Sequence, residues 1–234
     1  MNSFITKLIH IVLPSRCACC GQLIVEDEIC GRCKIALKYR GNKVCNKCGQ
    51  PAGSCECKHR NFLFAGIVAP FLHEGVAKQG VYGLKFAGKT AAAEYFGKEM
   101  VKELKKRVPE VVENCDFICE VPMSVEGERK RGYNQADLLA RVVAKELQIP
   151  YHPATLQKIK NNGVQHEINN YTDRYNNVRG VYSTAGQKLY RKNVILVDDI
   201  KTSGATLNEC AKCLRLAGAE SVWCVTATVR ESNN

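Results

Sequence analysis

Residues 193–207 constrain the fold of this chain more than any other stretch. Four consecutive apolar residues, 194–197, run directly into Asp198 and Asp199. An uninterrupted apolar run of this kind is typical of a parallel strand that is buried on both faces. Apolar residues then recur at helical spacing over residues 207–217. The stretch therefore predicts a strand, a loop and a helix, with two carboxylates at the tip of the strand.

The loop between this strand and this helix has the composition of an anion site. It contains Gly204 and the hydroxyl residues Thr202, Ser203 and Thr206. A glycine lets the backbone approach a phosphate closely, and a helix N-terminus offers amide donors and the positive end of the helix dipole. The spacing of Thr206 and Glu209 predicts a capping box at that N-terminus. We therefore expect this loop to bind a phosphate.

Asp198 and Asp199 add acceptor groups beside the loop. Carboxylates in this position suit the vicinal hydroxyls of a ribose or a hydrated Mg²⁺ ion. A solvated acidic turn is the alternative, but the apolar run, the acids, the loop and the helix start all coincide in one stretch. We therefore expect a site for a phosphorylated ribose.

This stretch resembles the phosphoribosyl-diphosphate motif of type I phosphoribosyltransferases. The resemblance implies that Asp198 and Asp199 are the catalytic pair that holds the ribose hydroxyls. It also implies a Mg²⁺ ion bound together with phosphoribosyl diphosphate. The residues expected to bind the phosphate and ribose are Lys201, Thr202, Ser203, Gly204, Ala205 and Thr206.

Closely spaced cysteine pairs mark the N-terminal part of the chain. Two such pairs supply the four thiolates of a tetrahedral zinc ion, and so short a segment needs metal to fold. Pairing in chain order predicts two structural zinc sites, the first from Cys17, Cys20, Cys30 and Cys33 and the second from Cys45, Cys48, Cys55 and Cys57. Crossed pairing stays open, as does a ligand role for Cys19 or His59.

The 14 cysteines could also indicate a secreted disulfide scaffold. The paired spacing and the lack of a signal-peptide pattern favour metal in a reducing compartment, so we expect a cytoplasmic protein. The opening residues 1–14 carry an apolar helical stripe. We interpret it as a short amphipathic helix packed on its own protein, with contact to a membrane surface or a partner as the alternative. No apolar run is long enough for a transmembrane segment.

The rest of the chain alternates between strand and helix patterns. Apolar runs at 116–122 and 221–229 predict further buried parallel strands, and helical patterns predict helices near 74–88, 91–107 and 136–147. We expect an α/β fold, a parallel sheet with helices on both faces, over residues 61–234, preceded by a zinc-ribbon module over residues 1–60. Polar residues 151–185 read as irregular chain or short strands above a ligand. Five further cysteines are expected in the core as small apolar residues: Cys115, Cys119, Cys210, Cys213 and Cys224.

A second candidate site is a basic segment before the helix at 136–147. Its residues are Arg129, Lys130, Arg131, Gly132, Tyr133, Asn134 and Gln135. Asn134 and Asp137 can cap the following helix. Cations at a helix start suit a pyrophosphate or a nucleic-acid backbone, and a tyrosine can stack on a base. A solvated basic loop is the alternative.

The formal net charge of +11 indicates a polyanionic partner, such as nucleic acid, or phosphorylated ligands. Lysines and arginines also surround the cysteine pairs. They form either a nucleic-acid face or a solvated basic rim, and the sequence does not choose between the two.

Motifs along nearly the whole chain resemble those of the ComF proteins, which are associated with DNA uptake during natural competence. Besides the cysteine pairs and the Asp-Asp stretch, the matching pieces are residues 84–89, 121–123 and 131–136, Gln165, Arg174, Asn177 and Val178. The resemblance implies a phosphoribosyltransferase fold, a zinc ribbon and the handling of incoming single-stranded DNA at the cytoplasmic face of the membrane. A ComF-type DNA helicase is the implied partner.

Two functions remain open from the sequence. In the first, the fold binds single-stranded DNA and a ligand such as ribose 5-phosphate or phosphoribosyl diphosphate without turnover. In the second, the protein is an active phosphoribosyltransferase that transfers ribose 5-phosphate to an amine or nucleobase. A weaker third possibility is a switch in which a bound nucleotide tunes DNA affinity.

Overall fold

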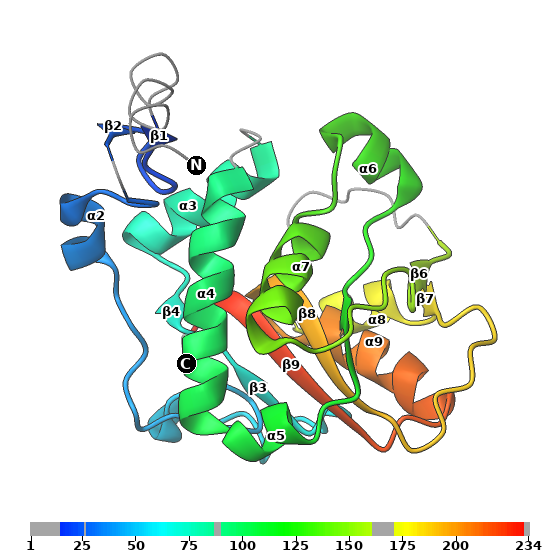
Figure 1. The fold of residues 1–234 in the computed structure, drawn as a ribbon. Coiled ribbons are helices and arrows are strands. Elements are labelled where there is room, and N and C mark those ends of the chain that lie inside the picture. Colours follow the sequence, from blue (N-terminus) through cyan, green and yellow to red (C-terminus); the bar gives the residue numbers. More distant parts are fainter. Residues whose placement is uncertain (1–14, 26, 87–89, 161–170, 232–234) are drawn as a thin grey trace.

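The computed structural model describes residues 15–25, 27–86, 90–160 and 171–231. A five-stranded parallel sheet lies at its centre, in the order β3-β9-β8-β5, with β4 pairing β9 beyond β3 (Figure 1). The strands are β3 (Gly66–Val68), β4 (Phe71–Leu72), β5 (Phe117–Glu120), β8 (Asn193–Lys201) and β9 (Ser221–Val229). The parallel sheet and the final strand at 221–229 are confirmed.

The apolar run of β8 is buried on both faces, as its sequence predicts. Ile195 and Val197 belong to one hydrophobic core, and Val194 and Leu196 belong to the other. This division follows from the alternation of side chains along a strand. β8 is therefore the interior strand that both helical layers cover.

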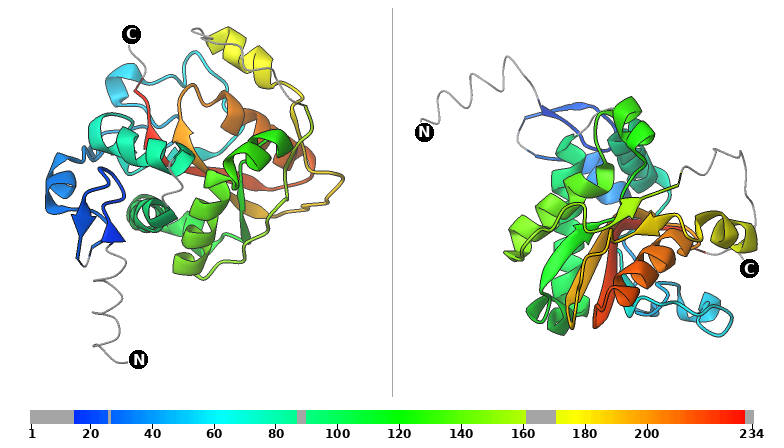
Figure 2. Two further views of the ribbon diagram at one scale, coloured as in Figure 1. Left: turned by 90° about the horizontal axis from the view of Figure 1, so that it is seen from above. Right: turned by 90° about the vertical axis from the view of Figure 1, so that its right-hand side faces the viewer.

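Helices cover both faces of the sheet (Figure 2). One layer contains α3 (Gly75–Phe86), α4 (Thr90–Arg107) and α7 (Gln135–Leu147), and the other contains α9 (Ala205–Leu216) with α8 (Tyr171–Val178) beside it. α4 and α7 approach closely because Gly97 has no side chain; a Cβ there would lie 2.6 Å from Val142. Pro109 follows α4 and is the first residue of the short helix α5 (Pro109–Glu113), where proline is well tolerated.

The polar region 151–185 is partly ordered by a short ladder. β6 (Gln157–Lys158) pairs antiparallel with β7 (Tyr182–Ser183), and Tyr182 packs into the core beside α9. The expectation of short strands is therefore confirmed. Gln165 and Gly88 lie outside the described residues, as does the side chain of Arg174.

The cysteine-rich part forms two small ribbons. The first contains β1 (Ser15–Arg16), β2 (Leu23–Ile24) and α2 (Gly31–Ala36), and the second contains a 3-10 turn, η1 (Ala52–Ser54). Residues of the first ribbon share the core of α3 and α4, whereas residues of the second share the core of α9. The division of the chain at residue 60 stays a prediction, and the amphipathic helix expected over 1–14 lies outside the described residues.

Three cysteines are core residues, as expected. Cys119, Cys210 and Cys224 are fully buried together, and burial raises the pKa of each thiol well above its usual value. Cys115 and Cys213 are half-buried, and each donates its thiol to a backbone carbonyl. Among the described residues, no helix is both long enough and apolar enough to span a membrane.

Candidate functional site

The two acids lie within the carboxyl-terminal half of β8. Asp198 pairs in register with Thr226 of β9, and the strand continues to Lys201. The acids therefore precede the strand end rather than form it, which corrects the expectation of a strand that stops at them. Asp198 is half-buried and its Oδ1 accepts a hydrogen bond from the amide of Asp199 at 2.8 Å, while Asp199 is buried.

The turn after β8 brings the expected phosphate-binding residues to the start of α9. Gly204 adopts φ +79° and is the N-cap residue of α9. An added Cβ would lie 3.3 Å from Lys201 and 3.4 Å from Phe62, so both conformation and space favour glycine. Thr202, Ser203 and Thr206 remain half-buried. The turn thus places hydroxyls and a helix N-terminus beside the acids.

The predicted capping box is wrong. No side chain caps α9, and Thr206 is already its second residue. Glu209 instead accepts a hydrogen bond from the amide of Gly180 at 2.8 Å and is buried. The positive end of the α9 dipole is therefore not neutralised by a side-chain cap, which suits an anionic ligand.

Lys201 does not join the phosphate turn through its ammonium group. Its side chain is fully buried, and Nζ lies 3.1 Å from Glu56 Oε2 of the second ribbon and 5.9 Å from the centre of the Phe62 ring. Burial lowers the pKa of Lys201, and the charge of Glu56 opposes this shift. The phosphate assignment below therefore uses residues 202–206 and leaves Lys201 out.

The basic segment is helical rather than a loop. Arg129, Lys130 and Arg131 form the last turn of α6 (Val125–Arg131), which Ser124 caps at its start and Gly132 ends at φ +87°. Cations are favourable at a helix C-terminus. Arg129 and Lys130 are exposed, whereas Arg131 is half-buried and donates to the side chain of Gln135.

The turn between α6 and α7 is fixed to the carboxyl edge of the sheet. Asn134 caps α7, as predicted, by accepting from the amide of Ala136 at 3.1 Å. Its Nδ2 donates to the carbonyl of Val121 at 3.0 Å, and the amide of Val121 donates to Val197 at 2.9 Å. Tyr133 donates its hydroxyl to the carbonyl of Leu84 in α3. The basic segment and the acids of β8 thus lie at the same edge of the sheet.

A buried acidic network at the end of β5 was missed by the sequence analysis. The Tyr151 hydroxyl lies 2.9 Å from Glu120 Oε2 and 2.6 Å from Asp137 Oδ1, and it has only one proton to donate. Burial raises the pKa of Glu120, and the charge of Asp137 raises it further. A protonated Glu120 satisfies all three groups. Asp137 was expected to cap α7 and instead binds Tyr151 and Arg141.

Other contacts around the phosphate turn also carried no sequence signal. Asn208 of α9 is buried and accepts from the amide of Leu63 at 2.6 Å. Tyr182 of β7 is buried beside Thr206, and this burial raises the pKa of its phenol. Such pairings join residues far apart in the chain, so no local pattern could indicate them.

The cysteines form two tetrahedral clusters with the predicted sequential pairing. The four sulfur atoms of each cluster lie within 4.8 Å of one another. Measured separations are 3.8 Å between Cys20 and Cys30 and 3.6 Å between Cys48 and Cys55. A zinc ion with bonds of about 2.3 Å to four sulfurs requires such spacing, so both clusters fit zinc. Neither Cys19 nor His59 belongs to a cluster.

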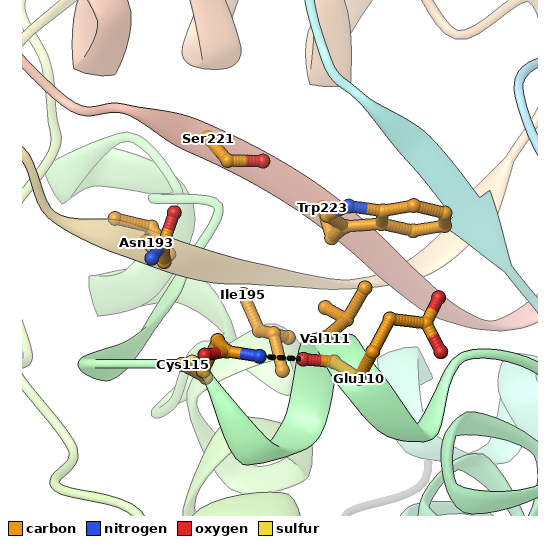
Figure 3. Close-up of a pocket in the computed structure, with 9 residues that line it drawn as sticks. Glu110, Val111, Cys115, Asn193, Ile195, Ser221 and Trp223 are labelled. Carbon is orange, nitrogen blue, oxygen red and sulfur yellow. Dashed lines mark hydrogen bonds between the residues drawn. The ribbon is translucent and has the colours of Figure 1, made fainter.

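A cavity of about 140 Å³ lies at the opposite, amino edge of the sheet (Figure 3). Trp223 and Ser221 of β9, Asn193 and Ile195 of β8, and Val111 of α5 line it. Ligands of open parallel sheets bind beyond the carboxyl ends of the strands. This cavity is therefore separate from the site formed by the acids, the phosphate turn and the basic segment.

Comparisons with known proteins agree with this architecture. Residues 8–61 match the double zinc ribbon domain, and residues 134–233 match the phosphoribosyl transferase domain. The chain is 28% identical to Competence protein F of Haemophilus influenzae over 92% of this chain and 90% of that protein. It is 25% identical to Competence protein ComFC of Bacillus subtilis, over 81% and 78%. It is also 25% identical to the DNA utilization protein YhgH of Salmonella typhi, over 94% and 100%.

Proposed function

Because this chain belongs to the ComF family, in which a double zinc ribbon is joined to a phosphoribosyltransferase-like domain, we propose that it binds a phosphorylated ribose and single-stranded DNA. The names of its relatives support a role in competence. The ligand we propose is ribose 5-phosphate or phosphoribosyl diphosphate, and the process is DNA uptake during natural transformation. A ComF-type DNA helicase is the protein partner that we propose on the family resemblance.

The observation that carries this proposal is the arrangement of β8 and α9. Asp198 and Asp199 would accept hydrogen bonds from the ribose hydroxyls. The turn at 202–206 and the start of α9, which no side chain caps, would bind the 5′-phosphate. A Mg²⁺ ion would neutralise the pyrophosphate of the larger ligand. The basic segment at the same edge supplies positive charge for that pyrophosphate or for DNA.

Calorimetry with phosphoribosyl diphosphate and Mg²⁺ tests the ligand. We expect saturable binding by the wild-type protein and at least about a tenfold weaker affinity for Asp199→Asn, because the carboxylate is a stronger acceptor than an amide. Asp116→Asn is the matched control, since Asp116 pairs with Lys192 at the amino end of β8. Equal affinity of all three proteins would contradict the assigned site.

Single-strand binding is tested through its salt dependence. Arg129 and Lys130 are exposed in the last turn of α6, so changing both to glutamine should reduce the slope of log affinity against log salt by about 1. Lys105 and Lys106 are exposed in the last turn of α4 and provide the control pair. The same loss in both double variants would indicate a general charge effect and no DNA site at α6.

An active phosphoribosyltransferase is the second candidate function. The acids that hold the ribose would also stabilise positive charge that develops at its anomeric carbon. Transfer to an amine or nucleobase would release pyrophosphate. A pyrophosphate-release assay with a panel of amines and bases separates the two functions: release that Asp199→Asn abolishes supports turnover, and binding without release supports the binding role.

A further inference from the structure

Glu56 lies between two ligands of the second zinc site. Its neighbours Cys55 and Cys57 belong to the cluster completed by Cys45 and Cys48. A zinc ion bound to both neighbours would fix the backbone on either side of Glu56. The carboxylate itself is buried and binds two cations, Arg60 at 2.5 Å and Lys201 at 3.1 Å.

Lys201 connects this carboxylate to the phosphate turn. It is the last residue of β8 and directly precedes Thr202. Gly204 lies over the methylene groups of Lys201 and the ring of Phe62, since a Cβ at Gly204 would be 3.3 and 3.4 Å from them. The side chain of Lys201 is therefore the surface on which the turn packs.

Further contacts hold both ends of the turn from the same side. At the strand end, Gln50 of the second ribbon donates to the carbonyl of Arg230 at 3.1 Å, and the amide of Arg230 donates to Lys201 at 2.8 Å. At the helix end, the amide of Leu63, just beyond the second ribbon, donates to Asn208 at 2.6 Å. The second ribbon and the segment that follows it thus support the turn over its whole length.

The first ribbon contacts a different part of the domain. Its Glu28 pairs with Lys98 of α4 at 2.5 Å. Cys19 lies against Gly80 of α3, where an added Cβ would be 3.2 Å from the Cys19 sulfur. The two zinc sites therefore have unequal relationships to the phosphate turn, although their ligand sets are alike.

We infer that the second zinc site holds the phosphate turn in its ligand-binding conformation through the Glu56–Lys201 ion pair. Glu56 and Lys201 are positioning residues: they act on residues 202–206 and not on the ligand. The effect on ligand affinity rests on the proposed function, whereas the effect on the turn does not. Removing either partner leaves a buried charge without its counter-charge, which destabilises the elements around it.

Hydrogen–deuterium exchange on the ligand-free, zinc-loaded protein tests the inference. Lys201→Met and Glu56→Gln should each accelerate exchange of the amides at 202–208 by at least about tenfold. Lys98→Met removes the comparable pair of the first ribbon and should leave these amides unchanged. Zinc content, measured in parallel, should remain two ions per chain in Lys201→Met, because Lys201 is not a ligand. Unchanged exchange at 202–208 in Lys201→Met would overturn the inference.

Two additions keep the outcomes distinct. If Lys201→Met does not fold, the double variant Glu56→Gln/Lys201→Met removes both charges; it should fold and still show faster exchange at 202–208, and normal exchange there would overturn the inference. Calorimetry with phosphoribosyl diphosphate and Mg²⁺ is then run on the same proteins. Absence of wild-type binding would contradict the proposed function alone, while wild-type affinity in Lys201→Met would contradict the coupling.

Discussion

The side-chain amide of Asn134 donates to the backbone carbonyl of Val121 at 3.0 Å, while its oxygen caps α7. One buried side chain thus joins the end of β5 to the turn between α6 and α7. Through this contact, the basic segment is positioned relative to the sheet and not only to its own helix. The carboxyl edge that contains Asp198 and the cationic last turn of α6 are therefore parts of one site.

Replacing Asn134 should destabilise this connection measurably. Asn134→Ala loses the cap and leaves the carbonyl of Val121 without its donor, so we expect a loss of about 2–3 kcal/mol in the free energy of unfolding. Asn134→Ser keeps a capping oxygen and should recover about 1 kcal/mol of it. Urea unfolding of the three proteins measures both values. Equal stability of the alanine and serine variants would show that the cap contributes nothing.

The pH dependence of stability should reveal Glu120. Burial raises its folded pKa, so its contribution to stability is present below the ordinary value of 4.5 and is lost as the pH rises through the folded pKa. Glu120→Gln keeps a donor for Tyr151 and carries no charge. We expect this variant to be more stable than the wild type at neutral pH, with the difference disappearing as the pH falls to 4.5. A difference that does not vary with pH would contradict this role.

Two glycines with similar backbone angles separate strain from ligand binding. Gly204 and Gly186 have φ +79° and +80°, but a Cβ would meet neighbouring atoms within 4 Å only at Gly204. Both alanine variants should lose about 1–2 kcal/mol from the left-handed conformation, and Gly204→Ala somewhat more. Calorimetry with phosphoribosyl diphosphate should show weaker binding in Gly204→Ala alone. Equal binding by both variants would contradict a phosphate at this turn.

Zinc stoichiometry should distinguish ligands from neighbouring cysteines. Cys20 belongs to the first cluster, whereas Cys19 does not, although the two are adjacent. We expect two zinc ions per chain in the wild type and in Cys19→Ala, and one in Cys20→Ala, by elemental mass spectrometry. Retention of two ions by Cys20→Ala, or loss of one by Cys19→Ala, would contradict the assigned ligands. Chelation should lower the stability of the whole chain, since each ribbon shares a core with the domain.

The parts predicted correctly are those with strong local patterns. The apolar run of β8, the cap at Asn134 and the cysteine spacing each depend on residues close together in the chain. The errors arose where tertiary contacts decide. Glu209 has the spacing of a capping box, but the amide of Gly180 takes its carboxylate. Lys201 has the position of a phosphate ligand, but Glu56 of the second ribbon binds its charge.

The central claim is that the end of β8 and the start of α9 form a seat for a phosphorylated ribose. A crystal structure of the protein with ribose 5-phosphate tests it most directly. The account predicts the phosphate within hydrogen-bonding distance of the amides and hydroxyls of residues 202–206, with the ribose hydroxyls on Asp198 or Asp199. A phosphate bound elsewhere, for example at α6 or in the cavity beside Trp223, with residues 202–206 empty, would contradict it.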